Sequence, residues 1–130
     1  MAVAKLHSHN GFQLAISDES ADSFYALVKL SSVIGNTAKN IYELELRELV
    51  AELRQLHETM TGEANIESLE GDFIAKFSAK PLGHIQIDAE ISEPDGPSLF
   101  RSTGNIDQSY LPTFITNLKK LDLSGDRGDS

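Results

Sequence analysis

The segment from residue 84 to residue 91 constrains the fold of this chain more than any other. Its polar and apolar side chains strictly alternate, which is the two-residue period of a strand that buries one face. The isoleucines and Ala89 would enter a core. The opposite face would carry one imidazole, one amide and two carboxylates: His84, Gln86, Asp88 and Glu90. The neighbouring segments are therefore expected to pair with this strand or to cover its apolar face.

The N-terminal third predicts further strands. Two apolar-rich segments, 2–8 and 12–17, flank His9-Asn10-Gly11, and Asn-Gly is a strong hairpin turn signal. A third strand is expected from residue 24 to about residue 33. We expect residues 35–37 to break it, and residues 37–42 to add a short strand.

Two helices are expected, and antiparallel strands lie between them. Residues 43–60 place leucines at spacings of three and four, the pattern of an amphipathic helix. Ser109 is expected to cap a second helix, with Pro112 in its first turn. Between the helices, the sequence predicts three strands joined by short turns, at 64–69, 72–79 and 98–106, in addition to the alternating segment.

These elements predict an α+β fold. We expect an antiparallel meander of about six or seven strands, against which the two amphipathic helices pack. The length of 130 residues fits one domain over residues 1–123, followed by a flexible tail over residues 124–130.

Composition narrows the classes of function. The formal net charge of -9 argues against nucleic acid as a direct partner, because phosphate binding needs clustered lysine and arginine. The absence of cysteine excludes disulfides and thiol catalysis. No apolar run is long enough for a membrane span, and no signal peptide is recognisable. A cytoplasmic protein is the expectation.

Three histidines form the one metal-like pattern. His7 and His9 stand two residues apart, so on a strand their imidazoles would share a face. A third ligand would have to come from another strand, where His84 or Asp88 is available. Paired exposed histidines are more commonly solvated, so we expect no metal. A metal or small-ligand site at His7, His9 and His84 remains the alternative.

No catalytic motif is recognisable. Asp88 and Glu90 point the same way, and paired carboxylates run acid–base chemistry when burial separates their pKa values. On a solvated strand face they are more simply surface charges. The serines lack a nucleophile elbow, and the glycines form no phosphate-binding loop. The sequence therefore favours a protein that is not an enzyme and that needs no cofactor.

The order of landmarks from Ile41 to Leu121 resembles a known family. The most specific segments are Leu82-Gly83-His84 at the start of the alternating strand and Asp107-Gln108-Ser109-Tyr110-Leu111 before the last helix. They follow an amphipathic helix with Gly62-Glu63-Ala64 behind it. This arrangement is similar to the WapI family of bacterial immunity-type proteins.

The resemblance implies a protein that binds and neutralises a toxin, typically a secreted nuclease-type effector. A nuclease surface is usually basic, so the acidic balance agrees with such a partner. We expect contacts from exposed acidic residues on the first helix and the central strand: Glu48, Glu52, Asp88 and Glu90. A third reading is a structural or oligomeric domain, for which an exposed apolar patch around Tyr25 and Leu27 would be the sign. Monomer and homodimer both remain open.

Overall fold

The computed structural model describes residues 2–18, 25–32, 35–68, 71–92 and 99–121. These residues form two antiparallel sheets, each a four-stranded meander. The first sheet contains β1 (Val3–His7), β2 (Gln13–Ser17), β3 (Tyr25–Ser32) and β4 (Gly35–Tyr42). The second contains β5 (Glu63–Glu67), β6 (Phe73–Lys80), β7 (His84–Ser92) and β8 (Leu99–Asp107). The tail predicted from residue 124 lies outside the described residues.

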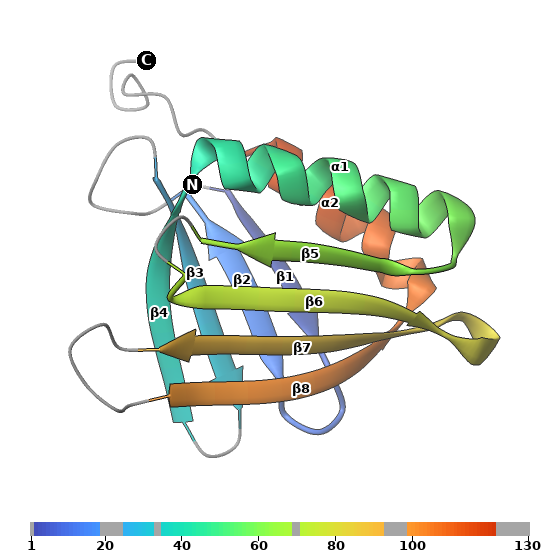
Figure 1. The fold of residues 1–130 in the computed structure, drawn as a ribbon, viewed down its shortest axis with the longest axis horizontal. Helices are drawn as coiled ribbons and strands as arrows, with labels where there is room; N and C mark the ends of the chain where they lie inside the picture. The colour runs from blue at the N-terminus through green and yellow to red at the C-terminus, as the bar shows by residue number, and fades with distance from the viewer. Residues whose placement is uncertain (1, 19–24, 33–34, 69–70, 93–98, 122–130) are drawn as a thin grey trace.

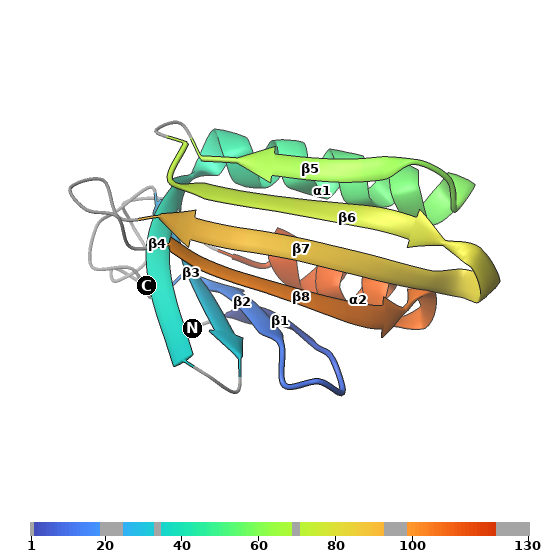
Figure 2. The same cartoon turned by 60° about the horizontal axis from the view of Figure 1, so that its bottom comes forward.

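Helix α1 (Glu43–Thr59) connects the two sheets, and the 3-10 turn η2 (Gln108–Tyr110) leads into α2 (Leu111–Lys119). The strands of the second sheet run across those of the first (Figure 1). Helix α1 lies along β5 and runs antiparallel to it (Figures 1 and 2), and α2 lies behind α1 in Figure 1. Helix α2 packs against α1 and β1. The two helices thus close the side of the sandwich where the sheets diverge.

The α+β fold with antiparallel meanders is confirmed, and the structure adds detail that the sequence pattern lacked. The strands divide between two sheets because the long helix α1 separates β4 from β5. Residues 35–37, expected to break a strand, instead begin β4 and pair with Leu30, Ser31 and Ser32 of β3.

The expected cap of the last helix is also wrong. Asp107, not Ser109, supplies the capping side chain, because its Oδ1 accepts a hydrogen bond from the Ser109 N–H at 2.8 Å. This bond starts η2. The following α-helix begins at Leu111 without a side-chain cap and carries Pro112 in its first turn.

The core lies between the two sheets and under the helices. The apolar face of β7 is confirmed: Ile85, Ile87, Ala89 and Ile91 are all 2% exposed or less. Helix α1 contributes a buried leucine stripe, Leu46, Leu49, Leu53 and Leu56. Helix α2 contributes Leu111, Phe114, Ile115 and Leu118. Each such side chain contributes about 1.5–3 kcal/mol of hydrophobic free energy relative to full exposure.

The β1–β2 turn is hydrogen-bonded to β8 and packs against it, and we call this contact the hairpin clamp. Asn10 Nδ2 donates to the Thr103 carbonyl at 2.8 Å, and the Asn105 N–H donates to Ser8 Oγ at 3.1 Å. Between these two bonds the buried ring of Phe12 lies on Gly104. A Cβ added at Gly104 would come within 2.5 Å of Phe12 Cδ1. Glycine is therefore required at residue 104 by close packing of the two sheets.

Candidate functional site

The outer side of the second sheet presents a continuous polar surface, which we call the sheet face. Its cross-strand rows follow from the register: Glu67, Ile74, Glu90 and Arg101 in one row, and Asn65, Lys76, Asp88 and Thr103 in the next. The alternation in β7 causes this placement, because it puts the isoleucines inside and the carboxylates outside. The sequence-predicted Asp88 and Glu90 therefore both lie on the sheet face.

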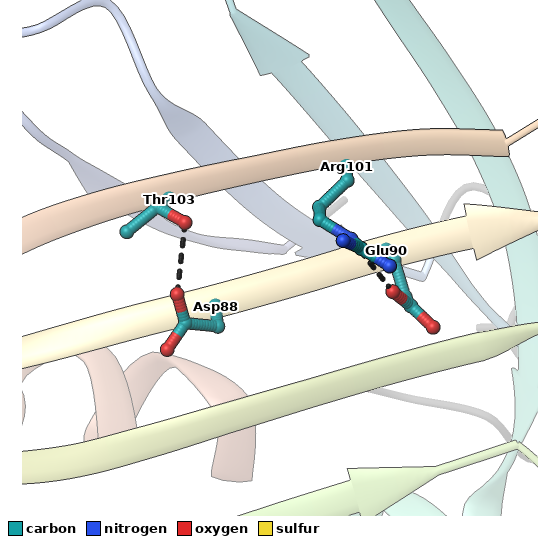
Figure 3. A network of polar contacts seen from close by, with 4 residues as sticks. All are labelled: Asp88, Glu90, Arg101 and Thr103. Atoms are coloured by element: carbon teal, nitrogen blue, oxygen red, sulfur yellow. Dashed lines mark hydrogen bonds and ion pairs between the residues drawn. The ribbon is translucent and has the colours of Figure 1, made fainter.

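Both carboxylates of β7 have partners on β8 (Figure 3). Asp88 Oδ1 accepts a hydrogen bond from Thr103 Oγ1 at 2.8 Å, and Asp88 Oδ2 accepts one from Gln86 Nε2 at 3.0 Å. Glu90 Oε2 lies 3.0 Å from Arg101 Nε. The Arg101 side chain is 66% exposed, so this ion pair is open to water and contributes at most about 1 kcal/mol.

A shallow hollow opens among these side chains. It has a volume of about 370 Å³ and is lined by Ile74, Lys76, Asp88, Ala89, Glu90 and Arg101. Ile74 is the one large apolar residue in this lining, and it is 36% exposed. The hollow thus combines the apolar surface of Ile74 with two carboxylates and with the cationic side chains of Lys76 and Arg101.

The two glutamates expected on the first helix have different surroundings. Glu52 Oε1 accepts a hydrogen bond from the Asn65 N–H of β5 at 3.0 Å, so this carboxylate covers the edge of the second sheet. Glu48 is exposed one helical turn earlier. Glu52 therefore borders the sheet face.

The edges of the second sheet are both occupied by side chains. Glu52 takes the Asn65 N–H at the β5 edge, and Ser8 and Asn10 take the Asn105 N–H and the Thr103 carbonyl at the β8 edge. Occupied edges disfavour the addition of a partner strand.

A second recess lies at the end of the sandwich where the hairpin, β8 and α2 meet; we call it the histidine groove. Its volume is about 580 Å³. Its buried apolar residues are Leu6, Ile106 and Phe114, and three exposed histidines line it: His7, His9 and His84. The structure therefore brings together the three histidines proposed from the sequence, although Asp88 is not among the lining residues.

Among the described residues, which include all three histidines, no group of three histidine, aspartate or glutamate side chains is arranged to hold an ion. The one carboxylate lining the histidine groove, Asp107, is directed to Ser109. The pKa of Asp107 lies below its ordinary value because the Ser109 backbone N–H stabilises the carboxylate, and His84 adds a weaker Coulombic contribution.

The two segments that carried the resemblance lie side by side at this groove. His84 pairs with Asp107 in the register of β7 and β8. Gly83 has φ +77, and a Cβ there would lie 3.0 Å from Gln108 Nε2. The two segments are separated by more than twenty residues, yet they form one corner of the molecule.

Comparison with known proteins decides the family. The model of the immunity protein WapI-like family matches residues 12–121, which is most of the chain. The chain belongs to the WapI-like immunity protein family. No curated protein and no solved structure matches it. The family match begins at Phe12, so it includes the β2–β4 part of the first sheet, for which the sequence offered no motif.

Sequence reasoning missed the residues that position these two sites. Arg101 and Thr103 were assigned only to a strand, and Gly104 was given no role. Their importance depends on the register of β8 against β7 and on contacts with the distant hairpin. Tyr25 and Leu27, named as a sign of oligomerisation, are only half-buried and are not among the well-exposed large apolar residues. No helix in the described part of the chain is long and apolar enough to span a bilayer.

Proposed function

We propose that this protein is a non-catalytic, cytoplasmic immunity protein that binds a basic toxin domain of nuclease type and neutralises it. The family match over residues 12–121 carries this proposal. The net charge of -9 supports a positively charged partner, because long-range attraction raises the association rate of oppositely charged proteins.

The sheet face is the surface that we assign to this partner. The face offers two carboxylates beside an exposed isoleucine, and its hollow is wide enough to accept a cationic side chain. The internal ion pairs do not oppose such contact strongly, since Glu90–Arg101 and Lys76–Glu63 are both exposed. An arginine of the partner would therefore take the place of Arg101 at Glu90. The new ion pair would be less exposed to water than the internal Glu90–Arg101 pair.

Glu48 and Glu52 extend the proposed surface onto α1. They lie beyond β5, whereas Asp88 and Glu90 lie two strands away on β7, so a partner touching both pairs would span β5 and β6. Such a footprint fits a folded domain and exceeds what a short peptide covers. Glu52 also has the structural bond to Asn65, so we expect it to contribute less to binding than Asp88 and Glu90.

The test uses the toxin candidate encoded beside this chain. Cells that produce the toxin domain alone should stop growing, and cells that also produce this protein should grow. The double variant Asp88→Lys, Glu90→Lys should lose protection while keeping its thermal unfolding temperature within a few degrees. The control Glu58→Lys, Thr116→Lys adds three positive charges, against four in the double variant, at exposed positions of α1 and α2 outside the proposed surface, and it should protect. Protection by the Asp88, Glu90 variant would contradict the assigned surface, and the absence of protection by the unmodified protein would contradict the function.

A further inference from the structure

The histidine groove has a chemistry opposite to that of the rest of the surface. Three of the four histidines in the chain line it, together with Lys5. The carboxylate among its lining residues is Asp107, which already accepts the Ser109 N–H. The recess thus gathers three imidazoles and one ammonium group, with a single carboxylate among them.

The interior of the groove is apolar. Leu6, Ile106 and Phe114 line it only with the 2%, 4% and 1% of their surface that the core leaves exposed, and Tyr110, which is 62% exposed, supplies the larger apolar surface at its rim. The volume of about 580 Å³ lies within the range of about 300–1,000 Å³ that is typical of small-ligand sites. The recess therefore pairs an apolar base with a rim of donors.

The shape of the groove is fixed by the surrounding backbone. Ser8, which lies between the two hairpin histidines, accepts a hydrogen bond from the Asn105 N–H of β8. His84 lies opposite Asp107 in the β7–β8 register. Because these bonds join segments that are distant in sequence, the histidines from β1, the β1–β2 turn and β7 are held around one opening before any ligand arrives.

We propose that the histidine groove binds a small organic anion with an apolar body, such as an aromatic or short aliphatic carboxylate or sulfonate. The apolar body rests on Leu6, Ile106 and Phe114, and the anionic head accepts hydrogen bonds from His7, His9 and His84. Lys5 adds a fixed positive charge. This site is separate from the sheet face, so it does not depend on the proposed toxin binding.

Metal and polyanion ligands fit the groove less well. The described histidines and carboxylates include no set of three arranged around an ion. A nucleic acid would need a longer basic track, whereas the neighbouring sheet face carries Glu63, Asp88 and Glu90. A single negative head on a compact apolar body matches both the size of the recess and the confinement of its positive charge.

The experiment uses the fluorescent probe anilinonaphthalene sulfonate with the full chain. We expect saturable binding of one probe per chain, with benzoate displacing the probe and benzylamine failing to do so. Benzoate and benzylamine have the same ring and opposite charge, so they separate recognition of the anion from general apolar binding.

Variants locate the probe. His84→Gln should weaken its binding by about fivefold or more, in line with loss of one charge-assisted hydrogen bond. Thr113→Trp should block the recess, because Thr113 is an exposed lining residue on α2. His57→Gln is the matched control, since this fourth histidine lies in α1 outside the groove, and it should bind normally. Circular dichroism confirms that each variant is folded. Unchanged binding in both His84→Gln and Thr113→Trp, or equal displacement by benzoate and benzylamine, would overturn the proposal.

Discussion

The sheet face and the histidine groove lie on the same two strands, β7 and β8, yet they present opposite chemistry. On the sheet face, Asp88 and Glu90 stand among exposed side chains, and each has a side-chain partner on β8. At the groove, Asp107 is bound to backbone, and histidines surround an apolar base. The net charge of -9 is therefore an average over surfaces of different sign.

The comparison shows how one alternating strand serves two surfaces. Its middle and end lie on the open side of the sheet, which supplies the carboxylates. Its first residue, His84, reaches the corner formed by the hairpin and α2. The hairpin clamp joins these regions, because it contacts Thr103, which belongs to the Asp88 row, and Asn105, which lines the groove. Substitutions in the hairpin clamp should therefore have larger effects than substitutions of individual carboxylates.

The largest expected effect comes from Phe12→Ala. Removing a fully buried aromatic side chain commonly costs about 3–5 kcal/mol of unfolding free energy, and Phe12 is 1% exposed between the two sheets. Urea unfolding would measure the loss. Phe100→Ala is the control, because Phe100 is a half-buried aromatic residue of β8, the strand on which Phe12 packs, and it should cost clearly less. Equal losses would mean that Phe12 has no special role in joining the sheets.

Gly104→Ala should have the next largest effect. The added methyl group would meet Phe12 within 2.5 Å, and such overpacking typically costs about 1–3 kcal/mol. The double variant Phe12→Ala, Gly104→Ala should lose less than the sum of the two single losses, since the smaller residue 12 leaves room for the methyl group. Strict additivity in urea unfolding would contradict the proposed contact.

Substitutions of Glu52 distinguish the contribution of its hydrogen bond from that of its negative charge. Glu52→Ala removes the acceptor of the Asn65 N–H and should cost about 1 kcal/mol of unfolding free energy. Glu52→Gln keeps an oxygen acceptor and should retain most of that stability while losing the charge. If Glu52→Gln is as unstable as Glu52→Ala, the negative charge rather than the hydrogen bond stabilises the edge of β5.

The smallest expected effect concerns pH and Asp107. Because the folded-state pKa of Asp107 is lowered, its contribution to stability is present above the ordinary carboxyl pKa of about 4. That contribution is lost as the pH falls through the lowered folded-state value. Thermal unfolding from pH 6 to pH 3 should therefore show a slightly smaller loss for Asp107→Asn than for the unmodified protein. Identical curves would contradict stabilisation of this carboxylate by Ser109.

The sequence predicted the elements better than their junctions. Alternation was sufficient for β7, and leucine spacing was sufficient for α1, because those patterns depend only on the local backbone period. Local patterns could not place Asn10 against Thr103, since 93 residues separate them. They also could not reveal that Gly104 accommodates Phe12, or that Asp107 rather than Ser109 begins η2. Register and sheet packing decide each of these.

The site residues show the same limit. Alternation placed Asp88 and Glu90 on one outward face, and the spacing of His7 and His9 suggested a shared site. Neither pattern identified Thr103 and Arg101 as partners of the carboxylates, because the β7–β8 register was unknown. His84 lies near the two hairpin histidines because the hairpin clamp holds the β1–β2 turn against β8, and no local sequence motif predicts that contact.

One measurement tests the central claim that the sheet face binds a basic toxin domain. Isothermal titration calorimetry would compare the Kd of the unmodified protein, Glu90→Lys and Glu58→Lys for the toxin domain encoded beside this chain, at low and high salt. The account predicts a loss of affinity of about tenfold or more for Glu90→Lys, a change within about twofold for Glu58→Lys, and weaker binding of the unmodified protein at high salt. Equal affinities for the two variants would contradict the claim.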